Sequence, residues 1–129
     1  MGNKKILIIE DDETFGEILN EYLLMKGFEV AVATDGLSGI ELHKAFSPDL
    51  VLLDIILPKM NGIEVSKTIR SKDKITPILF MSGTENQEDD LINSLDSEKN
   101  DYLEKGFHLD LLLCKINDRL GDIPESTII

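Results

Sequence analysis

Cysteine, basic residues and long hydrophobic runs are all scarce in this sequence of 129 residues. A single cysteine, Cys114, excludes an intramolecular disulfide framework and suits a reducing compartment, and we expect it to be buried as a small hydrophobe. The longest uninterrupted apolar runs, such as ILII and LVLL, have four residues, whereas a membrane helix needs about twenty. The chain is therefore expected to be soluble and cytoplasmic, with no membrane partner.

Positive charge is also in short supply. With 13 Lys and Arg against 25 Asp and Glu, the formal net charge is −12, and such a surface repels the phosphates that a nucleic-acid binder must attract. Direct binding of DNA or RNA by this chain is therefore not expected. The length suits one domain with one core, and we assign residues 1–121 to it and residues 122–129 to a C-terminal tail.

Short apolar runs recur at intervals that favour alternating strands and helices. They open at five positions: Ile6, Phe28, Leu50, Ile78 and Tyr102. The intervals are too wide for hairpins and suit five strand–helix units. Residues 15–23 and 109–120 show the helical period, and Gly27 is expected to end the first helix in the left-handed conformation. Short, continuous apolar strands predict an α/β fold, with a parallel sheet covered by helices on both faces.

Polar residues follow these strands at their carboxyl ends, which form the ligand crevice of an open parallel sheet. They are the acids Glu10, Asp11 and Asp12 after the first run, Asp54 after the third, Ser82 after the fourth and Lys105 after the fifth. Singly, each has an ordinary explanation as a helix cap, a turn former or a surface charge. Together they would form one cluster at one edge of the sheet.

Clustered carboxylates need a cation, because two of them about 4 Å apart repel by roughly 4 kcal/mol at an effective dielectric constant of about 20. Oxygen ligands of this kind suit Mg²⁺, and the absence of Cys and His from these segments disfavours zinc. A carboxylate beside Mg²⁺, with a lysine and a serine directed at the same point, can attack a phosphoryl group. Asp54 is the candidate nucleophile.

Four segments, in order and at matching spacing, resemble the receiver domain of two-component response regulators, of the chemotaxis-regulator kind. They are ILIIEDDE with its acidic pair, PDLVLLDIILPKMNG with the phospho-accepting aspartate, TPILFMSG with the switch hydroxyl, and DYLEK with an aromatic residue and a lysine. The resemblance covers residues 4–121. It implies a flavodoxin-like receiver fold, in which five parallel strands take the order 2-1-3-4-5.

The resemblance assigns roles to the acids. It implies that Asp54 is phosphorylated by a partner histidine kinase or histidine phosphotransfer protein. It further implies that Asp11 binds Mg²⁺ directly and Glu10 through water. Asp54 and the backbone carbonyl of Ile56 would complete the protein ligands. Asp12, one position beyond the family's acidic pair, is expected to cap a helix instead.

The resemblance also implies a switch. Ser82, rather than Thr84, matches the switch hydroxyl, Tyr102 the aromatic residue whose rotamer follows phosphorylation, and Lys105 the lysine that contacts the phosphate. The added charge and acceptor oxygens would draw Ser82 and Lys105 onto the phosphoryl group. The surface formed by the helix before Tyr102, the strand at Tyr102 and the last helix would then change its affinity for a downstream effector, or serve a homodimer. Such a domain catalyses its own phosphorylation and slow dephosphorylation but turns over no external substrate.

Three positions depart from the family pattern, and each leads to a prediction. Gly106 stands where the family usually has proline after a cis bond. A cis bond before another residue costs about 2.5–4 kcal/mol, so we predict a trans or mobile peptide here, which leaves the placement of the preceding lysine open. Polar bulk at residues 96–102 predicts a different end to the preceding helix. Ile56 is apolar where some relatives position a hydrolytic water, so self-dephosphorylation is expected to be slow.

His43 and His108 are expected to be solvated.

Three other functions compete with a phosphorylated receiver. A degenerate receiver that works without phosphate is disfavoured by the retained acids, hydroxyl and lysine, although Gly106 leaves it some room. A phosphatase with an aspartyl nucleophile would need an acid two residues after Asp54, where Ile56 stands. A flavin-binding electron carrier would need a Ser/Thr/Gly-rich phosphate loop after the first strand, and none follows it.

Overall fold

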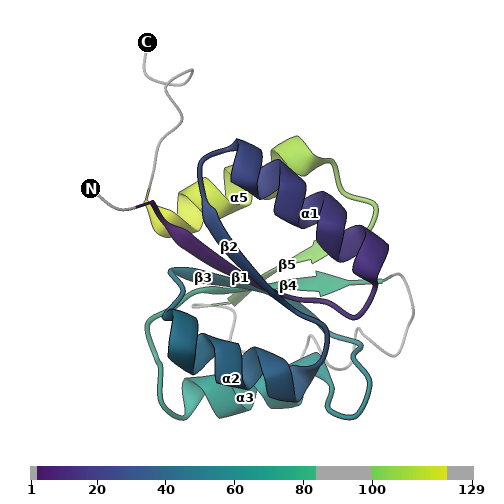
Figure 1. Ribbon diagram of the computed structural model, residues 1–129, viewed down its shortest axis with the longest axis vertical. Coiled ribbons are helices and arrows are strands. Elements are labelled where there is room, and N and C mark those ends of the chain that lie inside the picture. Colours follow the sequence, from purple (N-terminus) through teal and green to yellow (C-terminus); the bar gives the residue numbers. More distant parts are fainter. Residues whose placement is uncertain (1–2, 84–99, 122–129) are drawn as a thin grey trace.

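The computed structural model describes residues 3–83 and 100–121 of the chain. Over these residues the protein is a parallel sheet in the order β2-β1-β3-β4-β5, as predicted (Figure 1). The strands are β1 Lys5–Ile9, β2 Glu29–Ala33, β3 Leu50–Asp54, β4 Ile78–Ser82 and β5 Asn100–Glu104. Each apolar run identified in the sequence opens within two residues of the start of a strand.

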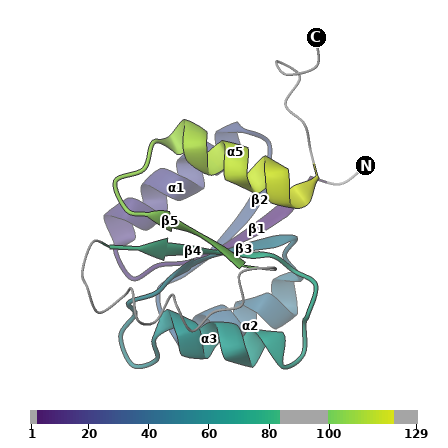
Figure 2. The same ribbon diagram turned by 180° about the vertical axis from the view of Figure 1, so that it is seen from behind.

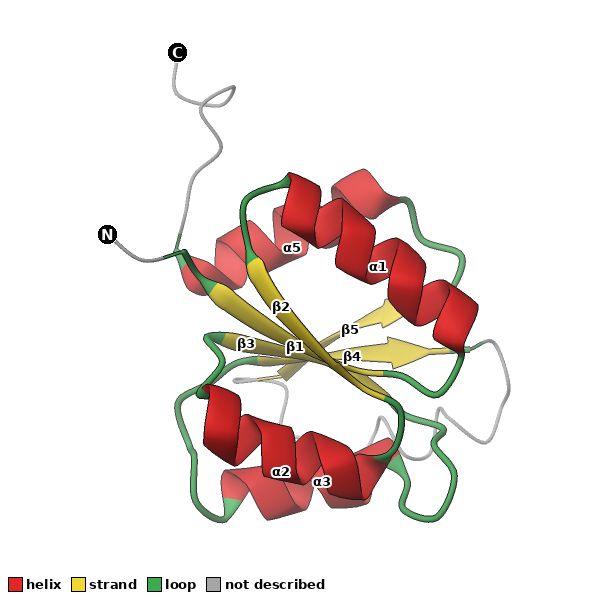
Figure 3. Ribbon diagram, viewed as in Figure 1, coloured by secondary structure: helices red, strands yellow, loops and turns green. Residues whose placement is uncertain are grey.

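Helices cover both faces of the sheet, which confirms the predicted fold class. α1 Glu13–Met25 and α5 Leu109–Leu120 lie on one face, and α2 Gly36–Phe46 and α3 Gly62–Arg70 lie on the other (Figure 2). Figure 3 shows the strands as a layer between these two pairs of helices. The helix predicted between the fourth and fifth strands, its altered end, and Thr84 all fall outside the described residues. No helix in the described part of the chain is long and apolar enough to cross a membrane.

Two hydrophobic cores fill the spaces between the sheet and its helix layers. All the residues of β3 and β4 are buried, because central strands of a parallel sheet are covered on both sides. Successive residues face opposite cores: Leu7 and Ile9 join the core under α2 and α3, and Ile6 and Ile8 the core under α1 and α5. Burying one such side chain stabilises the fold by roughly 1.5–3 kcal/mol, so the strand ends are rigid platforms.

Polar side chains begin the helices. Oδ1 of Asp12 accepts the backbone N–H of Phe15 at 3.1 Å, which confirms the predicted cap and starts α1 directly after the acidic pair. Oδ1 of Asp35 accepts the backbone N–H of Ser38 at 2.8 Å at the start of α2. Gly27 follows α1 with φ +93°, which confirms the left-handed end expected there.

Cys114 is exposed on α5, so the expectation of a buried thiol is wrong. The helix buries Leu112 and Ile116, which lie four residues apart on one face. Cys114 lies midway between them in sequence, and two residues of α-helix turn the chain by about 200°. Its side chain therefore points away from the core, because this run contains more apolar residues than one helix face can bury.

The two histidines differ in their surroundings. His108 is exposed just before α5, as expected. The expectation for His43 is wrong, because its side chain is only 13% exposed and its Nε2 lies 2.9 Å from Oδ2 of Asp73. The contact joins α2 to the loop between α3 and β4, two segments that are brought together when the two helices pack side by side on the sheet.

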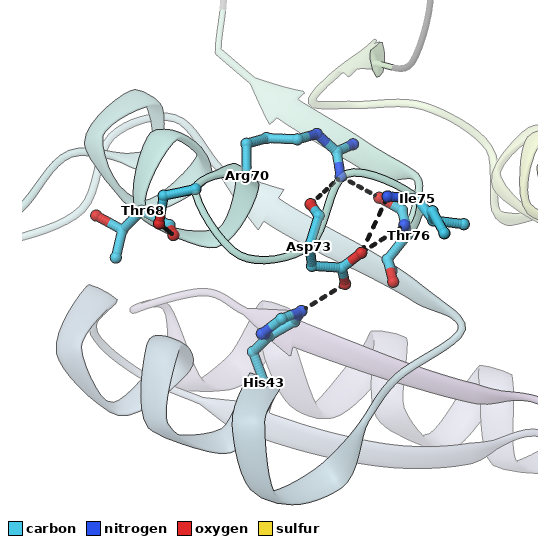
Figure 4. A network of polar contacts seen from close by, with 7 residues as sticks. His43, Thr68, Arg70, Asp73, Ile75 and Thr76 are labelled. Carbon is cyan, nitrogen blue, oxygen red and sulfur yellow. Dashed lines mark hydrogen bonds and ion pairs between the residues drawn. The ribbon is translucent and has the colours of Figure 1, made fainter.

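Asp73 is the centre of a wider set of polar contacts (Figure 4). Its Oδ1 accepts the backbone N–H groups of Ile75 and Thr76, both at 3.0 Å. Nη1 of Arg70 donates to the carbonyl oxygens of Asp73 at 3.2 Å and Thr76 at 2.6 Å. We call these contacts, with the His43 ion pair, the His43–Asp73 network. It lies where β4 begins, at the edge of the sheet opposite the strand ends that carry the predicted site.

Candidate functional site

Parallel strands end at one edge of the sheet, and there the polar residues singled out in the sequence come together. Glu10 directly follows β1, Asp54 ends β3 and Lys105 directly follows β5. The register pairs Ile9 with Leu53, which places Glu10 and Asp54 side by side on neighbouring strands. A cluster is thus assembled from segments that lie far apart along the chain.

Three carboxylates meet at this edge. One oxygen from each of Glu10, Asp11 and Asp54 lies within 4.8 Å of the other two. Glu10 is fully buried, Asp54 is 2% exposed and Asp11 is exposed. We call these three residues the acidic triad. Because carboxylates this close together repel one another, the triad favours a bound cation.

Lys105 supplies a positive charge to the triad. Its Nζ lies 3.0 Å from Oδ2 of Asp54 and 3.0 Å from Oε1 of Glu10. Its backbone N–H donates to the carbonyl oxygen of Ser82 on the neighbouring strand. The described residues contain no cis peptide bond, so the predicted trans bond before Gly106 is confirmed, and the lysine reaches the site with glycine after it.

The pKa values of these groups reflect the crowding. Burial raises the pKa of Glu10 to about 8, with a hydrogen bond to Asp54 and repulsion from it acting in the same direction and Lys105 opposing them. Burial lowers the pKa of Lys105, but its contacts with Asp54 and Glu10 outweigh this and raise it. One ammonium group therefore does not fully compensate the buried acids.

Asp54 stands on a tightly packed platform. Its Oδ1 accepts the backbone N–H of Ile56 at 3.1 Å. The N–H of Gly62 donates to the carbonyl oxygen of Ile55 at 2.7 Å, which folds the following loop back under the strand end. A Cβ atom on Gly62 would overlap the carbonyl oxygen of Asp54, so this close approach requires glycine. The carboxylate is therefore presented with little freedom.

The remaining predicted residues lie around this centre. Ser82 ends β4 next to Asp54 on β3 and is 4% exposed. Tyr102 lies on β5 at the sheet's edge and is 52% exposed, so its ring is not fixed by the core. Ile56 is 46% exposed on the loop that leaves Asp54. The geometry is compatible with the roles expected of these residues.

Two aromatic residues near Lys105 did not emerge from the sequence. The ring centroid of Phe15 lies 5.5 Å from Nζ of Lys105, and Phe107 contacts Phe15 with a centroid separation of 6.0 Å. Phe15 begins the helical pattern of residues 15–23, and such a pattern indicates only contact with the core. Its position four residues after Asp11 is the one signal that could have indicated a place beside the site.

Comparison with known proteins identifies the family. The sequence profile of the family described as "Response regulator receiver domain" matches residues 6–117. The chain belongs to this family. The receiver domain is 39% identical over 115 residues to the transcriptional regulatory protein DltR of Streptococcus agalactiae. That match covers 89% of this chain and 51% of DltR, so the chain spans about half the length of this relative.

Solved structures agree with the assignment. The receiver domain of the Francisella response regulator 1452 is 28% identical, with a TM-score of 0.81, and the match covers 92% of this chain and 98% of that one. The receiver domain of the sensor histidine kinase PA1611 from Pseudomonas aeruginosa shares the fold, with a TM-score of 0.83 and 22% identity over 94% of this chain and all of that one. That structure is described with a magnesium ion coordinated in its active-site cleft.

Membership of the family determines the general function. Receiver domains of response regulators act in two-component signalling through phosphorylation, bind Mg²⁺ in their active sites, and interact with histidine kinases and effectors. An aspartyl phosphatase and a flavin-binding carrier are thereby set aside. The competing possibility within the family is a receiver that works without phosphate.

Proposed function

We propose that this receiver domain accepts a phosphoryl group on Asp54. The observation that carries the proposal is the position of Lys105, whose Nζ lies 3.0 Å from both Oδ2 of Asp54 and Oε1 of Glu10. A nucleophilic carboxylate on a rigid strand end, with an ammonium group already in contact, is suited to in-line phosphoryl transfer. The two buried acids at this edge, Glu10 and Asp54, favour this function over that of a receiver working without phosphate.

The transfer itself is simple to write. An oxygen of Asp54 forms a bond to phosphorus as the phosphorus–nitrogen bond of a donor phosphohistidine breaks, and the leaving imidazole nitrogen takes up a proton. Lys105 neutralises charge on the oxygens of the phosphoryl group. Ile56 holds the carboxylate through its backbone N–H, which donates to Oδ1 of Asp54 at 3.1 Å and restricts its rotation.

The acidic triad fits a magnesium ion. Its three carboxylates are oxygen ligands within 4.8 Å of one another, and burial and the neighbouring Asp54 raise the pKa of Glu10 in spite of its contact with Lys105. We infer that Asp11 and Asp54 bind Mg²⁺ directly, Glu10 through water, and Ile56 through its backbone carbonyl. When bound, the ion neutralises charge on the transferred group and on the triad.

Phosphorylation would then act as a switch. It replaces one negative charge by roughly two and adds strong acceptor oxygens. We infer that Ser82, on the strand next to Asp54, and Lys105 move onto these oxygens, while the exposed ring of Tyr102 changes rotamer. Shifting such an equilibrium from mostly inactive to mostly active requires roughly 5 kcal/mol of preference for one state.

The partners follow from the same proposal. The donor would be a sensor histidine kinase or a histidine phosphotransfer protein in the cytoplasm. We infer that residues 1–121 form the receiver domain and residues 122–129 a tail, in a chain that spans 51% of the length of DltR. The face around β5 and α5 would contact an effector or a second copy.

A phosphorylation assay tests the proposal. The chain is incubated with Mg²⁺ and acetyl phosphate, and its intact mass is measured. We expect the wild type and Asp118→Ala, an exposed acid on α5, to gain one phosphoryl group. Asp54→Ala should gain none, and EDTA should abolish the gain in all variants. A wild type that gains no mass, or a gain that survives in Asp54→Ala, would contradict the proposal.

A further inference from the structure

The backbone around Lys105 gives its side chain little support. The next residue, Gly106, has φ +98°, and a Cβ placed there would meet no atom within 4 Å. The backbone N–H of Lys105 is held by Ser82, but its four-carbon stem has several rotatable bonds beyond that point. Such a stem loses considerable rotamer freedom when it is ordered. Contacts of the side chain itself are therefore needed to direct Nζ to the acids.

Two aromatic rings supply these contacts. Phe15, in the first turn of α1, has its ring centroid 5.5 Å from Nζ of Lys105, within the range of a cation–π interaction. Phe107, two residues beyond the lysine, has its centroid 6.0 Å from that of Phe15, with the rings inclined at 60°. This tilted arrangement is one that aromatic pairs favour.

The rings are anchored independently of the site. Phe15 and Phe107 are both partly buried and pack against the core under α1 and α5. Phe15 is positioned by a helix whose cap follows the acidic triad, and Phe107 belongs to the loop that carries the lysine. Their contact therefore joins the two segments that hold Lys105 and Glu10.

We propose that Phe15 and Phe107 form an aromatic clamp that positions the Nζ of Lys105 between Glu10 and Asp54. Phe107 ties the glycine-containing loop to α1, and the ring of Phe15 limits the directions open to the ammonium group. The two rings touch no reacting atom, so they are positioning residues that act through the lysine. The inference rests on the proposed function, because it concerns the efficiency of phosphoryl transfer to Asp54.

Leucine substitutions test the clamp while keeping the core filled. The rate of phosphorylation by acetyl phosphate with Mg²⁺ is measured by intact mass for the wild type, Phe15→Leu and Phe107→Leu. We expect each variant to be slower by roughly three- to tenfold, the change that corresponds to losing one interaction of this class. Phe107→Tyr, which keeps the ring, should restore a rate within twofold of the wild type.

A double-mutant cycle with Lys105→Ala separates positioning from general loss of structure. If the rings act through the lysine, Phe15→Leu and Phe107→Leu should slow the wild type but have no further effect on Lys105→Ala. Thermal unfolding of each variant is measured to check that it is folded at the assay temperature.

Phe46→Leu is a matched control at the opposite edge of the sheet. Phe46 is also partly buried, and Nζ of Lys5 lies 5.4 Å from its ring centroid. This variant loses a similar lysine–aromatic contact in the core under α2 and α3. It should phosphorylate at the wild-type rate.

The outcomes distinguish the clamp from the proposed function. Wild-type rates in Phe15→Leu and Phe107→Leu, or equal slowing of both the wild type and Lys105→Ala, would overturn the clamp while phosphorylation of Asp54 stands. A wild type that takes up no phosphoryl group would overturn the proposed function, and the clamp with it.

Discussion

The two edges of the sheet differ in how far their carboxylates are compensated by positive charge and hydrogen bonds. At the carboxyl edge, the acidic triad has three carboxylates and, among the described residues, one ammonium group in contact with them. At the opposite edge, the carboxylate of Asp73 has a histidine partner and two backbone N–H donors. The first edge is short of positive charge, whereas the second has its hydrogen bonds satisfied.

The pKa values separate the two edges as well. Burial raises the pKa of Glu10 to about 8. Burial also acts to raise the pKa of Asp73, but hydrogen bonds from Thr76, His43 and Ile75 lower it well below its usual range. A buried carboxyl group whose pKa is raised indicates a functional site. A carboxylate whose charged form is stabilised by hydrogen bonds indicates a structural role.

Glu10→Gln should therefore stabilise the protein in the absence of metal. A raised carboxyl pKa means that ionising Glu10 opposes folding, so the gain should be absent below about pH 4.5, grow up to about pH 8 and stay constant above it. We expect a gain on the order of 4 kcal/mol at pH 8. Urea unfolding in EDTA at several pH values measures this gain.

The control for this prediction is Glu17→Gln, which removes an exposed acid from α1. We expect it to change the free energy of unfolding by less than about 0.5 kcal/mol. Equal effects of Glu10→Gln and Glu17→Gln would mean that net charge, rather than the buried acid, limits stability. Glu10→Gln should also weaken Mg²⁺ uptake, because a ligand of the triad is lost.

Asp73→Asn should have the opposite sign. The amide weakens the contact with His43, and its oxygen is a weaker acceptor for the two backbone N–H groups. We expect the free energy of unfolding to fall by about 1–2 kcal/mol at pH 7, a value discounted because the side chain is 21% exposed. Because the pKa of Asp73 is lowered in the fold, this stabilisation is present above about pH 4 and is lost as the pH falls further. The wild type and the variant should therefore converge in acid.

Urea unfolding between pH 3 and 7, beside Asp118→Asn on the exposed side of α5, measures this convergence. A gap between the wild type and Asp73→Asn that stays constant down to about pH 3 would contradict the assigned role of the carboxylate. Phosphorylation by acetyl phosphate should be unaffected in both variants, since neither residue reaches the carboxyl edge.

The carboxyl edge was predictable from the sequence, and the opposite edge was not. Strand positions follow from apolar runs, and parallel strands place their carboxyl ends together, so Glu10, Asp54 and Lys105 had to meet. The trans bond before Gly106 followed from the cost of a cis bond before glycine. No such rule joins His43 to Asp73, which are 30 residues apart and touch only because α2 and α3 pack side by side.

Residues on helices were the hardest to place for a related reason. A periodic pattern identifies a helix, but it does not say which of several apolar residues the partner elements will cover. Cys114 and Phe15 both lie in such patterns, and one is exposed while the other reaches a lysine of the site. Pairwise contacts between elements decide these positions, and they come from packing rather than from local sequence.

Ile56→Asn should give a smaller effect, confined to the lifetime of the phosphorylated form. Ile56 is 46% exposed beside Asp54, and an amide there can orient a water molecule toward the aspartyl phosphate. We expect decay to accelerate by roughly two- to fivefold, equivalent to less than about 1 kcal/mol. The loss of phosphoryl mass with time, after removal of acetyl phosphate, measures it.

Ile75→Asn makes the same chemical change at the opposite edge, on a side chain that is 89% exposed. Its phosphorylated form should decay at the wild-type rate. Unchanged decay in Ile56→Asn would show that the residue does not control access of water, and equal acceleration in both variants would indicate a general effect of lost apolar surface.

Cys114→Ser should have the smallest effect, below about 0.5 kcal/mol in the free energy of unfolding, because the thiol lies on the outer face of α5. By contrast, Leu112→Ala, two positions earlier and fully buried, should cost about 2–5 kcal/mol. The native wild type should also react fully with a disulfide reagent without unfolding. A thiol that reacts only in urea would place Cys114 in the core and contradict the assigned orientation of the helix.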